Sequence, residues 1–339
     1  MRLNQRLDAF ARLGSVMRDA ASGSENNLTA GIIKVIEEYH ISNPWFTPDN
    51  VRRAVKASGE ELTRENLDYW VSSYPGLNEE RPVRDIAVIM AGNIPAVGFH
   101  DMMCVLLTGN KLVIKPSSKD DALLREIASA LCRIELGFAS MIRFVDGKLD
   151  EFDAVIATGS DNTARYFEYY FSRVPHLIRK NRTGIALLTG EESKKDIELL
   201  GEDVFSYFGL GCRNITKLYV PKDYNIKKLG ALWAKFSSLT TNHKYASNYD
   251  YHKAAMIINR DKFTDTGFVL LKHDPSLFSP VAVLNYEETD ASGFKTIIDS
   301  HSDKIQVITG AGHTPFGFAQ KPKLWDYSDN IDTIGFLLK

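Results

Sequence analysis

The stretch Ile86–Ser118 reads IAVIMAGNIPAVGFHDMMCVLLTGNKLVIKPSS, and it decides the fold. Its first six residues form a short apolar run that is typical of a buried strand, and Gly92–Pro95 forms a turn. Residues 97–107 then predict a helix that ends at Gly109, and Leu112–Ile114 predicts a second buried strand. A strand, a helix and another strand in this order indicate a parallel sheet.

The alternation continues toward the C-terminus. Residues 121–136 predict an amphipathic helix, and strands at 141–145 and 154–157 lead into a helix that runs through Phe171. This pattern predicts a doubly wound α/β domain. The later segments include strand-like runs at 185–190, 217–220, 255–258 and 305–308, and a helical pattern at 225–247.

The N-terminal part, residues 1–80, has the spacing of amphipathic helices. Thr47 and Pro48 predict a helix start, with Thr47 as the N-cap and Pro48 in the first helical position. Four arginines near the N-terminus resemble those of a mitochondrial presequence, but Asp8 and Asp19 argue against one. We therefore expect a packing helix at the N-terminus.

Composition excludes several classes of protein. The 339 residues are 44% hydrophobic and 25% charged, which is typical of one large or two smaller globular domains. With 41 basic and 43 acidic residues the chain has no global basic field, so we expect no nucleic-acid partner. It has no apolar run near the roughly 20 residues that span a bilayer. Three cysteines cannot form a disulfide framework, which favours a reducing, cytoplasmic location.

Polar residues follow three of the predicted strands. Asn93 could donate to a developing oxyanion, or it could be a turn asparagine. Lys115 begins the run Lys-Pro-Ser-Ser and could hold hydroxyls or phosphate, or it could be a solvated strand end. Residues 158–160, Thr-Gly-Ser, could bind a pyrophosphate or cap the following helix. The full G-x-G-x-x-G fingerprint is absent.

Of the three cysteines, Cys212 is the candidate nucleophile. Cys104 and Cys132 have apolar neighbours and are interpreted as packing residues. Cys212 lies in the loop FGLGCRN, in which two glycines allow close approach of a ligand and Arg213 favours the thiolate. It could also be an ordinary loop cysteine. The eight histidines are scattered and no H-E-x-x-H or C-x-x-C pattern occurs, so we expect no metal site.

The order of Asn93, Lys115, Gly159-Ser160 and Cys212 resembles that of the aldehyde dehydrogenase superfamily. The chain is more specifically similar to the acyl-CoA reductases of the bacterial luminescence type, the fatty-acid reductase component. Four segments carry that similarity, which covers nearly the whole chain: residues 43–47 (NPWFT), 91–98 (AGNIPAVG), 109–118 (GNKLVIKPSS) and the run from Phe316 to Leu337.

The resemblance implies an aldehyde-dehydrogenase-like α/β fold. Residues 1–195 would comprise an N-terminal helical segment and a doubly wound dinucleotide-binding domain. Residues 196–315 would form a second α/β domain that carries the cysteine, and residues 316–339 a tail that packs back on the fold. The implied reaction reduces a long-chain acyl thioester, from acyl-CoA or an acyl-carrier protein, to a fatty aldehyde.

The resemblance also implies roles for single residues. Cys212 would form an S-acyl intermediate, while Asn93 and the Cys212 backbone N–H would stabilise the oxyanion. The residues expected to bind the cofactor are Lys115, Ser117, Ser118, Gly159 and Ser160. Many NAD-using relatives have an acid three residues after the lysine; this sequence has Ser118 there, followed by Lys119, which favours NADPH.

The sequence departs from the superfamily pattern at two points. Many members have a glutamine two positions before the cysteine, where this chain has Leu210. The motif Glu-Leu-Gly-Gly-Lys, whose glutamate activates water, corresponds here to residues 182–187 (RTGIAL), which contain no acid. That loss suits a reductase, because a water-activating base would hydrolyse the thioester intermediate.

Two other functions remain open at this point. The chain could be a cysteine-dependent acyltransferase or thioesterase without hydride transfer, or a non-catalytic binding protein on the same fold. The superfamily resemblance also suggests a homo-oligomer.

Overall fold

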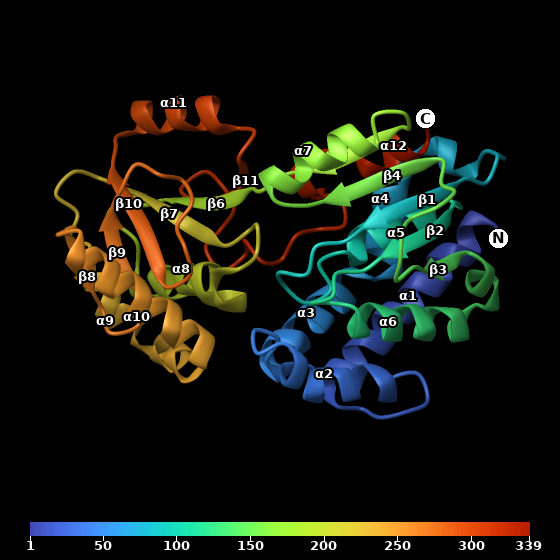
Figure 1. Ribbon diagram of the computed structural model, residues 1–339, viewed down its shortest axis with the longest axis horizontal. Coiled ribbons are helices and arrows are strands. Elements are labelled where there is room, and N and C mark those ends of the chain that lie inside the picture. The colour runs from blue at the N-terminus through green and yellow to red at the C-terminus, as the bar shows by residue number, and fades with distance from the viewer. The chain divides into compact units, whose positions relative to one another are not determined.

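The structure is a computed structural model that describes residues 1–339, apart from the side chain of Ala291. The chain forms two compact units (Figure 1). The first comprises Met1–Asn181 and Lys323–Lys339, and the second comprises Arg182–Pro322. The functional domains predicted from the sequence, with boundaries after residues 195 and 315, stay a prediction.

The first unit contains a five-stranded parallel sheet in the order β3-β2-β1-β4-β5. From β1 the chain moves outward through β2 to β3, and then returns to the other side of β1 at β4. The sheet is thus doubly wound, with its topological switch point between β1 and β4. The strands of this unit are β1 (Asp85–Ile89), β2 (Lys111–Lys115), β3 (Ile142–Phe144), β4 (Ala154–Thr158) and β5 (His176–Arg179).

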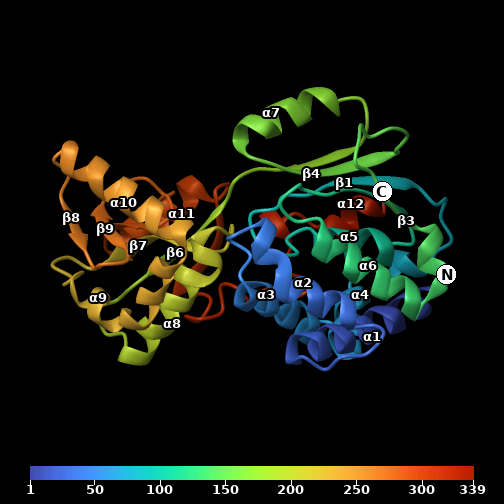
Figure 2. The same cartoon turned by 60° about the horizontal axis from the view of Figure 1, so that its bottom comes forward.

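Helices cover both faces of this sheet. Figure 2 shows α7 on one face, and α5 and α6 on the other. Ile86 and Val88 of β1 belong to the main core of the unit, whereas Ala87 belongs to a smaller cluster that also contains Phe167 of α7. The helices of this unit are α1 (Leu3–Ser22), α2 (Ala30–Ser42), α3 (Pro48–Glu61), α4 (Arg64–Ser72), α5 (Phe99–Leu107), α6 (Ala122–Ile134), α7 (Asp161–Tyr170) and α12 (Thr333–Leu337).

Local signals at helix starts are confirmed. Thr47 caps α3 by accepting a hydrogen bond from the Asn50 N–H, and Pro48 is the first helical residue. The N-terminal segment forms α1, whose apolar face, including Phe10 and Leu13, is buried in the core.

An arginine at the end of β5 anchors the C-terminal segment to the sheet of the first unit. The buried Arg179 guanidinium forms an ion pair with Asp101 at 2.6 Å and donates to the Ser328 carbonyl at 2.8 Å and the Thr333 hydroxyl at 2.9 Å. A buried charge needs such partners. The C-terminal tail is therefore part of the first unit's core.

The second unit contains a six-stranded sheet in the order β11-β6-β7-β10-β9-β8, which is parallel except for the edge strand β8. Its strands are β6 (Thr183–Leu187), β7 (Ile215–Val220), β8 (Phe263–Asp265), β9 (Leu270–His273), β10 (Val283–Glu288) and β11 (Ile305–Gly310). Its helices are α8 (Lys194–Phe205), α9 (Lys228–Leu232), α10 (His243–Ile258) and α11 (Ala291–His301).

One predicted strand is wrong. Residues 255–258, AMII, form the last turn of α10 rather than a strand. Met256 is buried, whereas Ile257 and Ile258 are 58% and 80% exposed.

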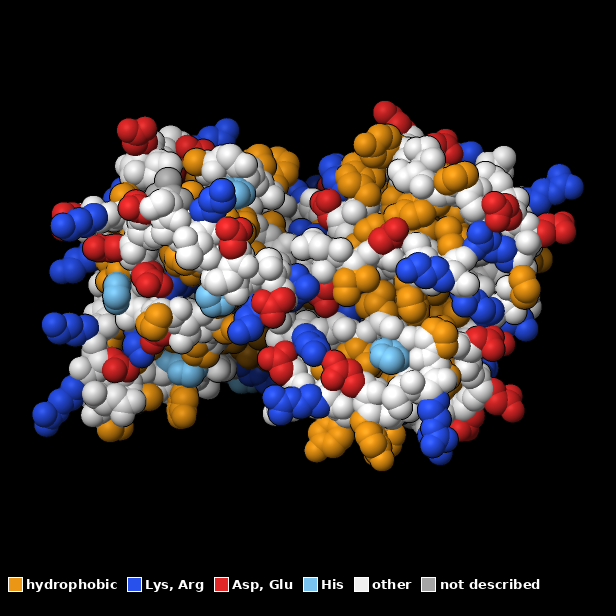
Figure 3. Space-filling view, turned by 90° about the horizontal axis from the view of Figure 1, so that it is seen from above, with side chains coloured by type: hydrophobic (Ala, Val, Ile, Leu, Met, Phe, Trp, Pro, Cys, Tyr) orange, Lys and Arg blue, Asp and Glu red, His pale blue; other side chains and the backbone are white. Residues whose placement is uncertain are grey.

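No helix in the described part of the chain is both long and apolar enough to cross a membrane. In the face shown in Figure 3, basic and acidic side chains are interspersed over both units. This mixing on the visible face agrees with the balanced charge of the sequence.

Candidate active site

Three strands of the first unit end side by side. Ile89 at the end of β1 is in register with Lys115 at the end of β2 and with Ala157 near the end of β4. The sheet therefore brings the loop that carries Asn93, the Lys-Pro-Ser-Ser turn and the turn containing Gly159 to one edge. In open α/β sheets, ligands bind at this carboxyl edge beside the switch point.

The loop after β1 packs tightly against the turn after β2. A Cβ on Gly92 would lie 2.4 Å from the Ser117 hydroxyl oxygen, so a side chain at this position would clash. Asn93, the next residue, is exposed. Glycine at position 92 thus allows two of the predicted site segments to touch, and it leaves the asparagine at the surface of the edge.

The predicted cofactor residues on the β2 turn are partly engaged within the protein. The Lys115 ammonium donates to the Gly147 carbonyl at 2.8 Å, and the Ser117 hydroxyl accepts from the Lys119 N–H at 3.2 Å. Ser118 is exposed. These two hydrogen bonds hold the turn in place, and the turn exposes Ser118 and Lys119 to solvent.

The turn after β4 begins a helix at the switch point. The Ser160 hydroxyl caps the ten-residue α7 by accepting from the Thr163 N–H at 3.3 Å. The Gly159 N–H donates to the Arg179 carbonyl at 3.2 Å, so this N–H extends the hydrogen bonding between β4 and β5. The capping role is confirmed. The N-terminus of α7 also has the positive dipole end that favours a phosphate group, and the predicted pyrophosphate contact stays a prediction.

Cys212 lies in the second unit, in the segment between α8 and β7. This segment starts with a short 3-10 turn, Ser206–Gly209, in which three successive residues are left-handed. Tyr207 and Phe208 have φ values of 53° and 58°, and Gly209 has 77°. The left-handed conformation costs a non-glycine residue about 1–2 kcal/mol. Residues in such conformations cluster at functional sites.

The fully buried Asn214 holds this cysteine loop in place. Its amide nitrogen donates to the carbonyls of Asp203 at 3.0 Å, Val204 at 3.2 Å and Ser206 at 2.9 Å. Its carbonyl oxygen accepts from the Gly211 N–H at 2.8 Å. One side chain thus ties the end of α8 to the residue before Cys212 and offsets the cost of the left-handed turn.

Asp203 links the same helix to the C-terminal part of the second unit. Its buried carboxylate accepts from the backbone N–H groups of Gly317 at 2.7 Å and Ala319 at 3.0 Å. Burial raises the pKa of this carboxyl to about 6, although the two hydrogen bonds act in the opposite direction. The cysteine loop is therefore supported by residues more than a hundred positions away.

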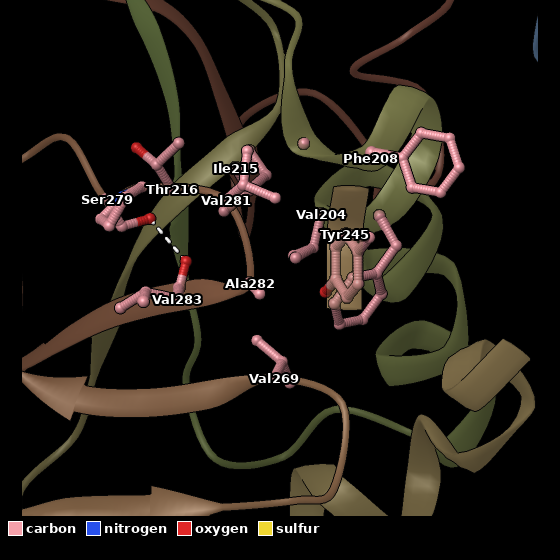
Figure 4. A pocket seen from close by; sticks show the side chains of 13 residues that line it. Val204, Phe208, Ile215, Thr216, Tyr245, Val269, Ser279, Val281, Ala282 and Val283 are labelled. Carbon is pink, nitrogen blue, oxygen red and sulfur yellow. Dashed lines mark hydrogen bonds between the residues drawn. The ribbon is translucent and has the colours of Figure 1, made fainter. Parts of the chain in front are cut away.

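A small cavity with a mixed polar and apolar lining lies against both ends of the cysteine loop. Phe208 and Gly209 before the cysteine, and Ile215 after it, line this cavity with Tyr245 and the segment from Ser279 to Val283. Figure 4 shows the Phe208 and Tyr245 rings on one side and Ala282 and Val269 on another. The cavity holds about 20 Å³, which is room for about one water molecule.

The sequence predicts that Cys104 and Cys132 are both buried packing residues, and the structure confirms full burial for Cys104 only. Cys104 is fully buried and burial raises the pKa of its thiol well above the usual value, which makes it unreactive. Cys132 and Cys212 are half-buried, and Cys132 packs against the core of the first unit. None of the three forms a disulfide in the structure as described.

No cluster of three or more histidine, cysteine or acidic residues that could hold a metal is found among the described side chains.

Sequence reasoning missed three residues that shape the candidate site. Asn214 and Asp203 brace the cysteine loop, and the fully buried Asp120 accepts a hydrogen bond from Ala96 in the loop of Asn93. Each is a single polar residue without a surrounding motif. Asn214 has one weak signal, because it directly precedes an apolar strand and follows the glycine-rich loop.

The sequence and the fold are similar to those of known proteins. A family model described as "Acyl-CoA reductase (LuxC)" matches residues 23–227, more than half of the chain, and this range contains every predicted site residue. No curated protein matches the sequence.

Among solved structures, an acetylating aldehyde dehydrogenase from Geobacillus thermoglucosidasius has a TM-score of 0.62 at 10% identity, with 96% of this chain and 86% of that chain covered. An NAD-dependent benzaldehyde dehydrogenase from Corynebacterium glutamicum has a TM-score of 0.60 at 13% identity, covering 88% and 76%. Proline utilization A has a TM-score of 0.64 at 12% identity, and this chain spans 36% of its length. The fold is that of the aldehyde dehydrogenases.

Proposed function

The chain belongs to the LuxC family of acyl-CoA reductases, and from this premise we propose that it reduces a long-chain acyl thioester to a fatty aldehyde through Cys212. The observation that carries this proposal is the position of Cys212. It is a half-buried cysteine three residues after a left-handed turn, in a loop that a buried asparagine holds in place and within the range that the family model matches. A fixed, reachable thiol is what nucleophilic catalysis requires.

In the first half-reaction the Cys212 thiolate attacks the carbonyl carbon of the acyl thioester. A new C–S bond forms, and the electron pair of the carbonyl moves onto its oxygen. Asn93 donates to that oxyanion, and one such donor typically contributes about 3–4 kcal/mol. Collapse of the tetrahedral intermediate breaks the bond to the donor thiol and leaves the acyl group on Cys212.

The second half-reaction needs a reduced nicotinamide dinucleotide, and the first unit fits one. Its strand order places a switch point between β1 and β4, and the capped N-terminus of α7 begins there. We assign Lys115, Ser117, Ser118, Gly159 and Ser160 to this cofactor. When bound, it supplies a hydride to the acyl carbonyl. Cys212 then leaves as a thiolate and the aldehyde is released.

The decisive experiment separates the two half-reactions. Wild-type protein incubated with an acyl-CoA should gain one acyl mass on Cys212, detected by intact-mass and peptide analysis, and NADPH should then release that mass as aldehyde. The Asn93→Ala variant should acylate more slowly and keep nearly the same affinity for NADPH. An adduct that only water or thiols remove indicates a thioesterase or acyltransferase, and the absence of any adduct indicates a binding protein; either result contradicts the proposal.

The cofactor should be NADPH rather than NADH. Ser118 is exposed on the turn after β2 and is followed by the exposed Lys119, so a cation and no carboxylate would face the ribose 2′ position. We expect kcat/KM to be higher for NADPH, and a Lys119→Glu change to reduce that preference. Equal kcat/KM values for the two cofactors would show that this turn does not select between them.

A further inference from the structure

A buried carboxylate joins two of the loops at the carboxyl edge of the first unit. Asp120 is fully buried, and its carboxylate accepts from the Ala96 N–H at 2.7 Å and from the Tyr39 hydroxyl at 3.2 Å. Its own N–H donates to the Ser117 carbonyl at 3.0 Å. Asp120 therefore lies between the loop after β1, the turn after β2 and helix α2.

The surroundings of Asp120 are fixed by further hydrogen bonds from helix α2. The Tyr39 hydroxyl also accepts from the Ala122 N–H at 3.2 Å, and Asn43 at the end of α2 donates to the Lys119 carbonyl at 3.2 Å. These contacts connect α2 to the residue before Asp120 and to the start of α6, which follows it. The carboxylate is therefore a fixed point, against which the loop after β1 is placed.

The link from Ala96 back to Asn93 is short and stiff. Pro95 fixes its own φ near −65°, and Ile94 is restricted because it precedes a proline. Ala96 has a φ of 57°, a left-handed conformation that is unusual for alanine. At Gly92, on the other side of Asn93, the backbone touches Ser117. A shift of the Ala96 N–H therefore moves Asn93.

We propose that Asp120 is a positioning residue, which holds Asn93 at the site of the oxyanion through the backbone of Ala96. This inference rests on the proposed function, in which Asn93 donates to the oxyanion during acylation of Cys212. Burial, with a smaller contribution from the charge of Asp121, raises the pKa of Asp120 to about 7, although the hydrogen bonds from the loop and from Tyr39 lower it. Near neutral pH the protonated form is well populated, so asparagine is a close mimic of the native side chain.

The test measures single-turnover acylation of Cys212 by an acyl-CoA, without NADPH, in variants of the full-length protein. Asp120→Ala removes the acceptor of the Ala96 N–H and should slow acylation by about tenfold. Asp120→Asn keeps an acceptor and should stay within about threefold of wild type. In the Asn93→Ala background, Asp120→Ala should have almost no further effect, because residues that act as one unit are not additive. Should Asp120→Ala not fold, Asp120→Ser, whose side chain is too short to reach Ala96, replaces it.

Three controls separate positioning from a general loss of structure. Tyr39→Phe removes a partner of Asp120 but leaves the Ala96 bond, so it should lower the melting temperature with little change in acylation. Asp121→Ala removes the neighbouring carboxylate, which pairs with Arg125, and should acylate like wild type. Alkylation of Cys212 by iodoacetamide forms no oxyanion and should be unchanged in every variant.

The inference would be overturned if the tenfold loss of acylation rate in Asp120→Ala persisted in the Asn93→Ala background. It would also be overturned if Asp120→Asn showed the same loss, or if alkylation of Cys212 slowed as well. Normal acylation of Asp120→Ala would overturn it equally. If wild-type protein forms no adduct at all, the proposed function fails first, and the inference loses its premise.

Discussion

Replacing Cys212 with alanine is expected to abolish the acyl adduct and to lower aldehyde formation by at least about a thousandfold. The proposed reaction passes through a covalent bond to this sulfur, so no other group can take over the transfer. Intact-mass analysis after exposure to acyl-CoA measures the adduct, and NADPH oxidation measures turnover. Affinity for NADPH should stay close to that of wild type, because the residues assigned to the cofactor belong to the other compact unit.

Cys132→Ala is the matched control. This cysteine is also half-buried, but it lies on α6 and packs against the core of the first unit. Its loss should leave both the adduct and turnover intact. Cys212→Ser should acylate very slowly, because a hydroxyl is a far weaker nucleophile than a thiolate at neutral pH. A full-size adduct on Cys212→Ala would place the nucleophile elsewhere.

Predictions from the sequence succeeded where the signal was local. The apolar runs of β1 and β2 and the intervening helix lie within a few residues of their predicted positions, because each run is bounded by its own turn residues. The N-caps Thr47 and Ser160 were also recognisable, since a cap bonds to an N–H three residues away. The alternation of strands and helices also indicated the parallel, doubly wound sheet, whereas the order of its strands came only from the structure.

The failures have two physical causes. The run 255–258 is short and apolar, and such a run cannot be assigned to a strand or a helix by periodicity alone; it forms the end of α10. The supporting residues were missed for another reason. Asp203 bonds to residues 317 and 319, and Asp120 bonds to Tyr39, so their partners are distant in sequence. Each of these aspartates also stands next to a second acidic residue, Glu202 or Asp121, and such a pair in a sequence gives no sign that one member is buried.

A single buried residue of this kind can contribute much to stability. Replacing Asn214 with alanine should lower the free energy of unfolding of the second unit by about 3–5 kcal/mol. The change leaves three buried carbonyls and the Gly211 N–H without their partner, at about 1–3 kcal/mol for each group that finds no substitute. The left-handed turn at Tyr207 and Phe208 then lacks the contacts that offset its cost. Urea unfolding measures the loss, and the acylation rate of Cys212 should fall with it.

Asn285→Ala controls for the loss of a buried amide as such. Asn285 is also buried in the second unit and donates to the carbonyls of Ser276 at 3.0 Å and Phe278 at 3.2 Å, neither of which belongs to the cysteine loop. Its loss should destabilise the unit by less and leave the acylation rate of folded protein unchanged. If folded Asn214→Ala acylates as fast as wild type, the loop does not depend on this side chain and its left-handed turn must be held in another way.

Asn214→Asp provides a sharper version of the same test. It keeps the shape of the side chain and an acceptor for the Gly211 N–H, but it removes the amide donor and places a carboxylate against three carbonyl oxygens. Repulsion from these oxygens raises the pKa of the new carboxyl in the folded state, so the variant is least stable at neutral pH and regains stability as the pH falls and the group binds a proton. A stability deficit relative to wild type that does not shrink between pH 7 and pH 5 would show that the carbonyls do not converge on this side chain.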